Sequence, residues 1–364
     1  MKNLFINLLE TLSQNNAELL QRYISKGLIS DEDMVQIKNT IRIRKAKESP
    51  ELISFLDSKG LSDKFLSGNT DFVSRLVNLF SNDHKILDKL KVEGGVCTFD
   101  EFKKGRNIFR DFCKKWEKEA KIIANIVDVK ARVTNANVGP YEILMKILIK
   151  GACAEERKGD VCINDNGEIV GCEVKKGGKQ GARVSGQKTA NIHDMYDKLN
   201  EYMANECGCT QVYRDYWQKQ ATFVHIEEML KSATKNKDDI EDIFFESLCK
   251  AVFTQYLLDP NSQQCKEIAK SVKEYNKRKK GIVNYSVNSE VLSDILGAIQ
   301  VYAYAIEDGF DYITIYEGNT GDYVCLETND LIDVNNTLKY IYFTVVGAAG
   351  AQAVREKTGR PCLR

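Results

Sequence analysis

Two short apolar segments flank the turn sequence Asn164-Asp165-Asn166-Gly167, and this arrangement constrains the fold more than any other feature. The first segment spans residues 159–163 and the second spans residues 168–175. An Asn-Gly pair between two such segments is a strong short-range signal for a β-hairpin. The sequence therefore predicts a hairpin at residues 159–175, so the fold must include a sheet even though helical patterns dominate elsewhere.

Helical patterns lie on both sides of this hairpin. Only four prolines occur in 364 residues, so long helices are permitted almost throughout the chain. Leucines and aromatic residues recur at three- and four-residue steps in residues 1–130, which predicts an all-α accessory domain. A helical insertion is expected at about residues 190–280, and a further helix over residues 291–306 that opens at Asn288.

Other segments rich in β-branched and aromatic residues predict additional strands. These lie at residues 283–287, 312–316, 323–326 and 338–346. The predicted fold class is α/β, more narrowly α+β, with a central mixed sheet flanked by helices. This sheet and the helical insertion form a domain over residues 131–346, and a peripheral tail at residues 347–364 follows it.

The composition excludes several classes of protein. The 52 Lys and Arg residues balance 52 Asp and Glu residues, which excludes a wholly basic nucleic-acid binder but allows a local basic patch. No segment reaches the ~18 apolar residues of a membrane span, so no membrane partner is expected. The apolar start of the chain reads as a helix, not a signal peptide. The 11 cysteines then read as reduced thiols of a cytoplasmic protein.

The cysteines and histidines give little support for a structural metal site. Cys207 and Cys209 form the only close cysteine pair, whereas a zinc ribbon needs two such pairs. An iron–sulfur cluster that adds Cys249 and Cys265 would have no recognised spacing. His193, beside Asp194, is either a catalytic base or a residue at a helix N-terminus, and the sequence favours the second reading.

Charged residues of the hairpin are expected to meet at its open end. Side chains alternate along a strand, so Glu173 and Lys175 share one face while Val174 points into the core. Asp160 begins the partner strand and approaches the same end. Two carboxylates favour a hard cation such as Mg²⁺ or Mn²⁺, and a nearby amine can orient water or stabilise negative charge. The alternative is an exposed hairpin whose acids only pair with Lys175.

This pattern resembles the PD-(D/E)xK nuclease superfamily, which has the restriction-endonuclease-like fold. The resemblance implies that Asp160 and Glu173 bind the metal, with the Val174 carbonyl as an extra ligand, and that Lys175 positions the attacking water. Members often carry a further acid on the preceding helix, and Glu142 fits that place. Alternatively, Glu142 is simply an acidic residue in the first turn of a helix, where the helix dipole favours a negative charge. Gly159 stands where the family has a proline.

A second likeness is to RecB-like members of that superfamily, which carry Gln-x-x-x-Tyr on a later helix. Gln300 and Tyr304 match this motif and lie on one face of the predicted helix. The likeness implies that these two residues hold DNA or the active-site hairpin. The alternative is that the tyrosines of this segment simply pack in a buried helix.

The loop after the hairpin is basic and rich in glycine, with no acidic residue. We expect Lys176, Lys179 and Arg183 to contact nucleic acid, because cations neutralise phosphates and glycines let backbone N–H groups approach them. A solvated loop is the alternative. The basic run at residues 277–280 could extend this surface, although such runs are more often solvated turns.

Together these features predict an Mg²⁺- or Mn²⁺-dependent nuclease that hydrolyses DNA. The alternative is a non-catalytic phage structural or nucleic-acid-binding protein on the same fold. The sequence does not distinguish DNA from RNA as the substrate, since the same chemistry serves either polymer. The segment from Lys158 to Arg183 also resembles bacteriophage-encoded nuclease-like proteins, which implies a host cytoplasm or a virion as the location. The sequence also leaves two kinds of protein partner as alternatives: further copies of this chain in a homo-oligomer, or a phage or host protein.

Overall fold

The computed structural model describes eight stretches of the chain. They are residues 50–61, 84–112, 140–154, 157–177, 192–211, 224–317, 320–345 and 359–363. The chain divides into two compact units, which we describe separately. Unit 1 is Met1–Thr98 with Phe112–Glu155, and unit 2 is Phe99–Asp111 with Glu156–Arg364. The boundary expected near residue 130 lies outside the described residues and stays a prediction.

The described part of unit 1 is mostly helical and contains a buried lysine. Its elements are α4 (Pro50–Ser58), α7 (His84–Glu93), α11 (Pro140–Leu148) and the short β1 (Ala152–Cys153). The ammonium group of Lys59 is buried and donates to the carbonyl oxygens of Gly94 at 2.6 Å and Ile149 at 3.1 Å. Both carbonyls follow the C-terminal ends of helices, where the helix dipole favours a cation. Lys59 therefore joins the ends of α7 and α11.

A mixed sheet forms the centre of unit 2, as the sequence predicts. Its strands run in the order β2 (Val161–Asp165), β3 (Glu168–Gly177), β6 (Tyr312–Glu317) and β7 (Tyr323–Glu327). The pairs β2–β3 and β6–β7 are antiparallel, whereas β3 and β6 are parallel. The predicted strands at residues 312–316 and 323–326 are therefore confirmed.

The predicted hairpin is present, and its turn explains its register. Asn166 has φ 56° and Gly167 has φ 96°, the left-handed conformations that a two-residue type I′ turn requires. Asp165 and Glu168 pair on either side of this turn. The Lys103 ammonium group also reaches the Asp165 carboxylate, at 3.3 Å. The first strand begins at Val161, so Asp160 lies just ahead of it.

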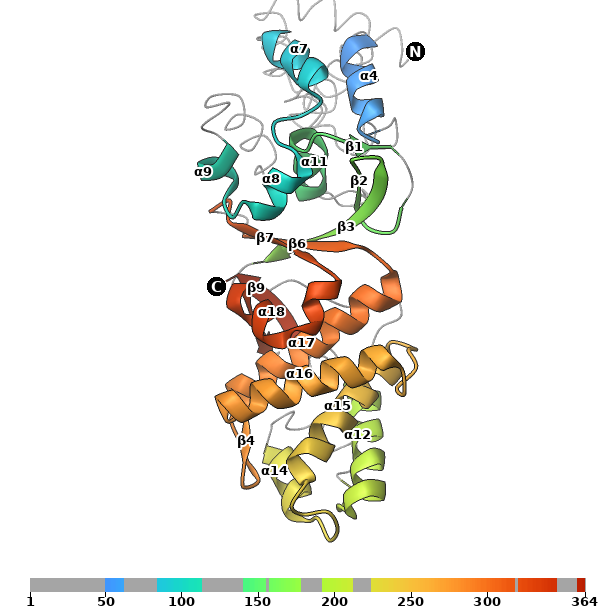
Figure 1. Cartoon of the computed structure of the whole chain (residues 1–364), viewed down its shortest axis with the longest axis vertical. Helices are drawn as coiled ribbons and strands as arrows, with labels where there is room; N and C mark the ends of the chain where they lie inside the picture. The colour runs from blue at the N-terminus through green and yellow to red at the C-terminus, as the bar shows by residue number, and fades with distance from the viewer. Residues whose placement is uncertain are drawn as a thin grey trace, which may run out of the picture. The chain divides into compact units, whose positions relative to one another are not determined.

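Helices cover both faces of this sheet (Figure 1). On one face, α17 (Ser289–Asp308) shares a hydrophobic core with Ile313, Val324 and neighbouring apolar residues of β6 and β7. On the other face lies α8 (Phe99–Lys104), where the Phe102 ring stacks on Tyr323 with 4.5 Å between the ring centroids. The short α9 (Ile108–Phe112) follows α8. The sheet is thus buried between two layers of helix.

The predicted helix after Asn288 is confirmed, and local chemistry sets both of its ends. The Asn288 side chain caps α17 by accepting hydrogen bonds from the backbone N–H groups of Glu290 and Val291. The helix ends at Gly309, which has φ 71° and closes the last turn. Capping at both ends fixes the twenty residues that carry Gln300 and Tyr304.

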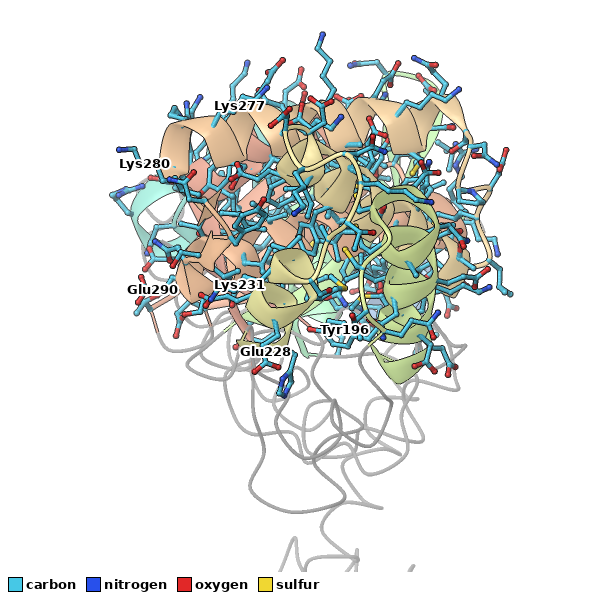
Figure 2. The ribbon with its side chains drawn as sticks, turned by 90° about the horizontal axis from the view of Figure 1, so that it is seen from below. Tyr196, Glu228, Lys231, Lys277, Lys280 and Glu290 are labelled. Carbon is cyan, nitrogen blue, oxygen red and sulfur yellow. The ribbon has the colours of Figure 1, made fainter. Side chains whose placement is uncertain are left out.

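Four described helices occupy residues 192–279 and share one apolar core. They are α12 (Ile192–Cys207), α14 (Val224–Lys231), α15 (Ile240–Gln255) and α16 (Gln263–Lys279). The basic run lies at the C-terminal end of α16, and Lys277 and Lys280 are exposed there (Figure 2). The short antiparallel pair β4 (Ile282–Val283) and β5 (Ser286–Val287) leads into α17. It replaces the single short strand expected at residues 283–287.

The strand predicted at residues 338–346 begins too early and is wrong in its first part. After a short 3₁₀ helix, η1 (Asn329–Ile332), the chain forms α18 (Val334–Tyr340). Asp333 caps α18 through its carboxylate, which accepts from the N–H groups of Asn335 and Asn336, so residues 338–340 remain helical. The strand β8 (Ile341–Val345) follows and pairs with β9 (Gly359–Leu363), within the expected tail.

Candidate active site

Asp160 and Glu173 lie opposite each other at the open end of the hairpin. Val161 pairs with Cys172, so the next position outward on each strand brings Asp160 beside Glu173. The Asp160 backbone N–H donates to the Cys172 carbonyl at 3.0 Å, and its carboxylate accepts from the Val174 N–H at 2.9 Å. The two carboxylates therefore converge, as the strand pattern predicts, and Val174 is buried.

The Glu173 carboxylate is held by two further side chains. Its Oε1 atom accepts a hydrogen bond from the Lys175 ammonium group. The same oxygen accepts a hydrogen bond from the Tyr304 hydroxyl at 2.6 Å. The Lys175 nitrogen also lies 5.6 Å from the centroid of the Tyr304 ring, within cation–π distance. The predicted placement of Glu173 and Lys175 on one face is confirmed, and Tyr304 of α17 contacts the hairpin.

The electrostatics of the site follow from the burial of these carboxylates. Burial raises the pKa of Asp160 to about 6, with a second contribution from the Glu173 charge, whereas the Val174 amide and Lys175 act in the opposite direction. Burial and the Glu173 charge also raise the pKa of Tyr304, so its hydroxyl keeps its proton and remains a donor. The site therefore concentrates negative charge where water solvates it poorly.

The donor set fits a hard divalent cation. Asp160 and Glu173 supply carboxylate oxygens, which Mg²⁺ and Mn²⁺ prefer. The N–H and C=O of a strand residue point to the same side, so the Val174 carbonyl faces the side on which Asp160 lies. Among the described residues, no group of three or more His, Cys, Asp or Glu side chains is placed to hold a metal. A cation here would complete its shell with the Val174 carbonyl and water, which Mg²⁺ commonly retains.

The geometry of this cluster does not test the other predicted site residues. Glu142 lies half-buried in α11 of unit 1, and Gln300 is buried one turn before Tyr304 in α17. The backbone of Lys176 belongs to β3, whereas Lys179 and Arg183 lie outside the described residues. The roles of these five residues stay predictions. His193 lies in the first turn of α12, the position that the sequence favours.

Sequence reasoning missed one ion pair that lies close to the cluster. Arg157 binds the Asp311 carboxylate with two hydrogen bonds, at 3.2 Å from Nε and 3.1 Å from Nη2. Arg157 lies three residues before Asp160, and Asp311 lies directly before β6. The two residues are separated by 154 positions, so no local spacing indicates that they meet. The only local signal for this ion pair is the charge of Asp311, which lies directly before the strand predicted at residues 312–316.

Comparisons of the chain with protein-family models, curated proteins and solved structures give no match. A mixed sheet flanked by helices supports many unrelated activities, so the fold alone does not identify a function. Among the described helices, none has the length and apolar character needed to cross a membrane. The functional argument therefore depends on the geometry around Asp160, Glu173 and Lys175.

Proposed function

We propose that this protein is a metal-dependent nuclease with a restriction-endonuclease-like core, which hydrolyses phosphodiester bonds of DNA by attack of water. The observation that carries the proposal is the convergence of Asp160, Glu173 and Lys175 at one end of the hairpin. Two carboxylates that can bind a cation, together with a nearby amine, are sufficient for cation-assisted phosphodiester hydrolysis. The alternation of the strands and the N–H of Val174 hold these groups in place.

Asp160 and Glu173 would hold Mg²⁺ or Mn²⁺, with the Val174 carbonyl as a further ligand. When bound, such a cation polarises a phosphoryl oxygen and lowers the pKa of a water molecule. The raised pKa of Asp160 supports this assignment, because a nearby positive charge would favour its ionised form. Without a cation, the partly buried pair of carboxylates is costly to keep.

The roles of Lys175 and Tyr304 follow from their contacts with Glu173. Lys175 keeps 24% of its side chain exposed, so its ammonium group can reach a water molecule or a phosphate oxygen as well as Glu173. Its positive charge then compensates the negative charge that develops on the phosphate group. Tyr304 retains its proton and fixes one Glu173 oxygen by donating to it. The resemblance to the nuclease superfamily implies a 5′-phosphate product.

Phosphate contacts outside the site are assigned to the basic loop after β3. Lys176, Lys179 and Arg183 would neutralise backbone phosphates on either side of the scissile bond. Because this attraction releases counterions, the affinity for DNA should fall as salt rises. The whole-chain charge of zero means that this affinity depends on a local surface.

The experiment is a cleavage assay with supercoiled plasmid and linear DNA in Mg²⁺, Mn²⁺ or EDTA. The wild type should cut DNA only with a divalent cation, and Glu173→Gln and Lys175→Ala should each lose at least ~100-fold of this activity. Glu168→Gln is the matched control, because Glu168 is an exposed acid at the other end of the same strand. This control should cut as the wild type does.

Three results would count against the proposal, and a fourth would correct its substrate. Cleavage that persists in EDTA would exclude a cation-dependent mechanism, and equal loss in Glu168→Gln would point to a general effect on the strand. Folded protein that cuts neither polymer would favour the non-catalytic nucleic-acid-binding alternative. Cleavage of RNA but not DNA would preserve the chemistry and correct the substrate.

A further inference from the structure

Asp311 is fixed to the sheet by its backbone as well as by its side chain. Its N–H donates to the Gly171 carbonyl at 2.9 Å, and its own carbonyl accepts from the Thr328 N–H at 2.9 Å. Its carboxylate accepts from the Gly171 N–H at 2.8 Å. Asp311 therefore continues the β3–β6 pairing one residue before β6 begins, and its side chain has little freedom to move.

Arg157 links Asp311 to the loop of residues 157–160, which carries Asp160. Its guanidinium group binds both oxygens of the Asp311 carboxylate, a geometry that restricts orientation as well as distance. Its backbone N–H donates to the Cys162 sulfur at 3.1 Å, which joins the loop to β2. The loop of residues 157–160 is thus held at Arg157 by contacts to Asp311 and to Cys162 of β2, and at Asp160 by its hydrogen bonds to β3.

The loop crosses β3 at very short range. A Cβ atom on Gly171 would overlap the Lys158 carbonyl oxygen and would lie 2.9 Å from the Lys158 carbonyl carbon. A Cβ atom on Gly159 would lie 2.9 Å from the Cys172 backbone, and Gly159 has φ 112°, a conformation that favours glycine. Two glycines therefore allow the loop to pass directly over the strand that carries Glu173.

We infer that Arg157 and Asp311 are positioning residues that set the Asp160 carboxylate against Glu173 for cation binding. This inference rests on the proposed nuclease function. Neither residue touches the reacting atoms in this assignment, because Arg157 acts through the loop and Asp311 acts through Arg157. Removal of a group that holds a metal-binding residue in place typically lowers cation affinity or activity by ~10–100-fold.

The ion pair is well suited to a mutational test because it is partly exposed. Arg157 and Asp311 have 47% and 31% of their side chains exposed, and such pairs contribute little to stability. Arg157→Ala and Asp311→Asn should therefore fold. Asn at position 311 keeps an oxygen that can accept from the Gly171 N–H, so this variant removes mainly the charge. Arg110→Ala is the matched control, since Arg110 forms an exposed ion pair with Asp111 at 2.7 Å.

The full-length variants should be compared by steady-state DNA cleavage with Mg²⁺ and by Mn²⁺ binding without DNA, measured by electron paramagnetic resonance. Arg157→Ala and Asp311→Asn should lower kcat by ~10–100-fold and weaken Mn²⁺ binding by a similar factor, with KM for DNA within about twofold. Arg157→Lys should recover part of kcat, because it restores one charge but not the two parallel hydrogen bonds. Arg110→Ala should match the wild type.

The inference is overturned if Arg157→Ala retains wild-type kcat and Mn²⁺ affinity, or if Arg110→Ala loses as much. Its failure is separable from that of the proposed function. A wild type that binds Mn²⁺ without cutting DNA would refute the nuclease, and the Mn²⁺ affinities of the variants would still decide the positioning role. If the wild type binds no Mn²⁺, amide exchange decides: faster exchange of the Val174 N–H in Arg157→Ala supports the link to Asp160, and unchanged exchange overturns it.

Discussion

The Tyr304 hydroxyl donates to the Glu173 carboxylate at 2.6 Å and thereby joins helix α17 to strand β3. Burial and the negative charge of Glu173 raise the pKa of Tyr304, so the donor persists at every ordinary pH. The other donor to the same oxygen is Lys175, which lies on the same strand as Glu173. Glu173 is therefore oriented by one group of its own strand and one group from a distant part of the chain.

Tyr304→Phe is expected to destabilise the protein and to lower its activity. Removing the hydroxyl leaves a buried carboxylate with one donor fewer, which typically costs about 1–3 kcal/mol. The free energy of unfolding in urea should fall by that amount, and cation-dependent cleavage should fall with it. Tyr302→Phe is the control, because Tyr302 is equally buried on α17 but packs near Phe253. Equal losses in both variants would show that the hydroxyl of Tyr304 has no special role.

Asp160→Asn is expected to stabilise the protein at pH 7 while it abolishes cleavage. The pKa of Asp160 is raised from 3.8 to about 6, so between these values the folded state binds the proton more tightly than the unfolded state. The free energy of unfolding therefore falls as pH rises through this window, by about 1–3 kcal/mol in total. Thermal unfolding in EDTA should show the variant melting higher at pH 7, with no difference below about pH 4. A variant that melts lower at pH 7 would contradict this prediction.

Divalent cations are expected to stabilise the wild type through the same pair of carboxylates. A ligand that binds only the folded state adds about 2.7 kcal/mol at one hundred times its dissociation constant. Mn²⁺ should therefore raise the unfolding temperature of the wild type, but not that of Asp160→Asn or Glu173→Gln. Glu168→Gln should respond as the wild type does. If all four proteins shift equally, the cation binds elsewhere.

Lys59 is expected to give unit 1 an unusual dependence on pH. Burial lowers the pKa of Lys59 from 10.5 to about 8, so between these values the unfolded state binds more protons than the folded state. The Lys59 contribution to the free energy of unfolding therefore rises with pH in this window, by up to about 1.4 kcal/mol per pH unit. Urea unfolding from pH 8 to pH 10 should show a smaller gain for Lys59→Met than for the wild type. Parallel curves would show that Lys59 keeps its proton over this range.

Local signals predicted the elements in which turn or cap chemistry is unambiguous. The Asn166-Gly167 turn and the Asn288 cap both appear in the structure where the sequence places them. The convergence of Asp160 and Glu173 was also predictable, because both belong to one hairpin and strand alternation decides which side chains meet. These features depend only on residues that are close in the sequence.

The errors and omissions have physical causes of two kinds. Residues 338–340 were predicted as strand because the β-branched and aromatic composition of the following residues was extended backwards, whereas the Asp333 cap holds them in α18. The Arg157–Asp311 pair was missed for another reason. It joins residues 154 positions apart, so it depends on the parallel pairing of β3 with β6, which no local pattern specifies.

The crossing of the Asp160 loop over β3 also defines an evolutionary constraint. Any side chain at position 171 would collide with the Lys158 carbonyl group, so a homologue that keeps this crossing must keep glycine two positions before its acidic residue. Glu-x-Lys arises by chance in any charged chain, but Gly-x-Glu-x-Lys preceded by a short Asn-Gly hairpin is far rarer. That longer signature is the pattern with which diverged relatives of this protein can be recognised.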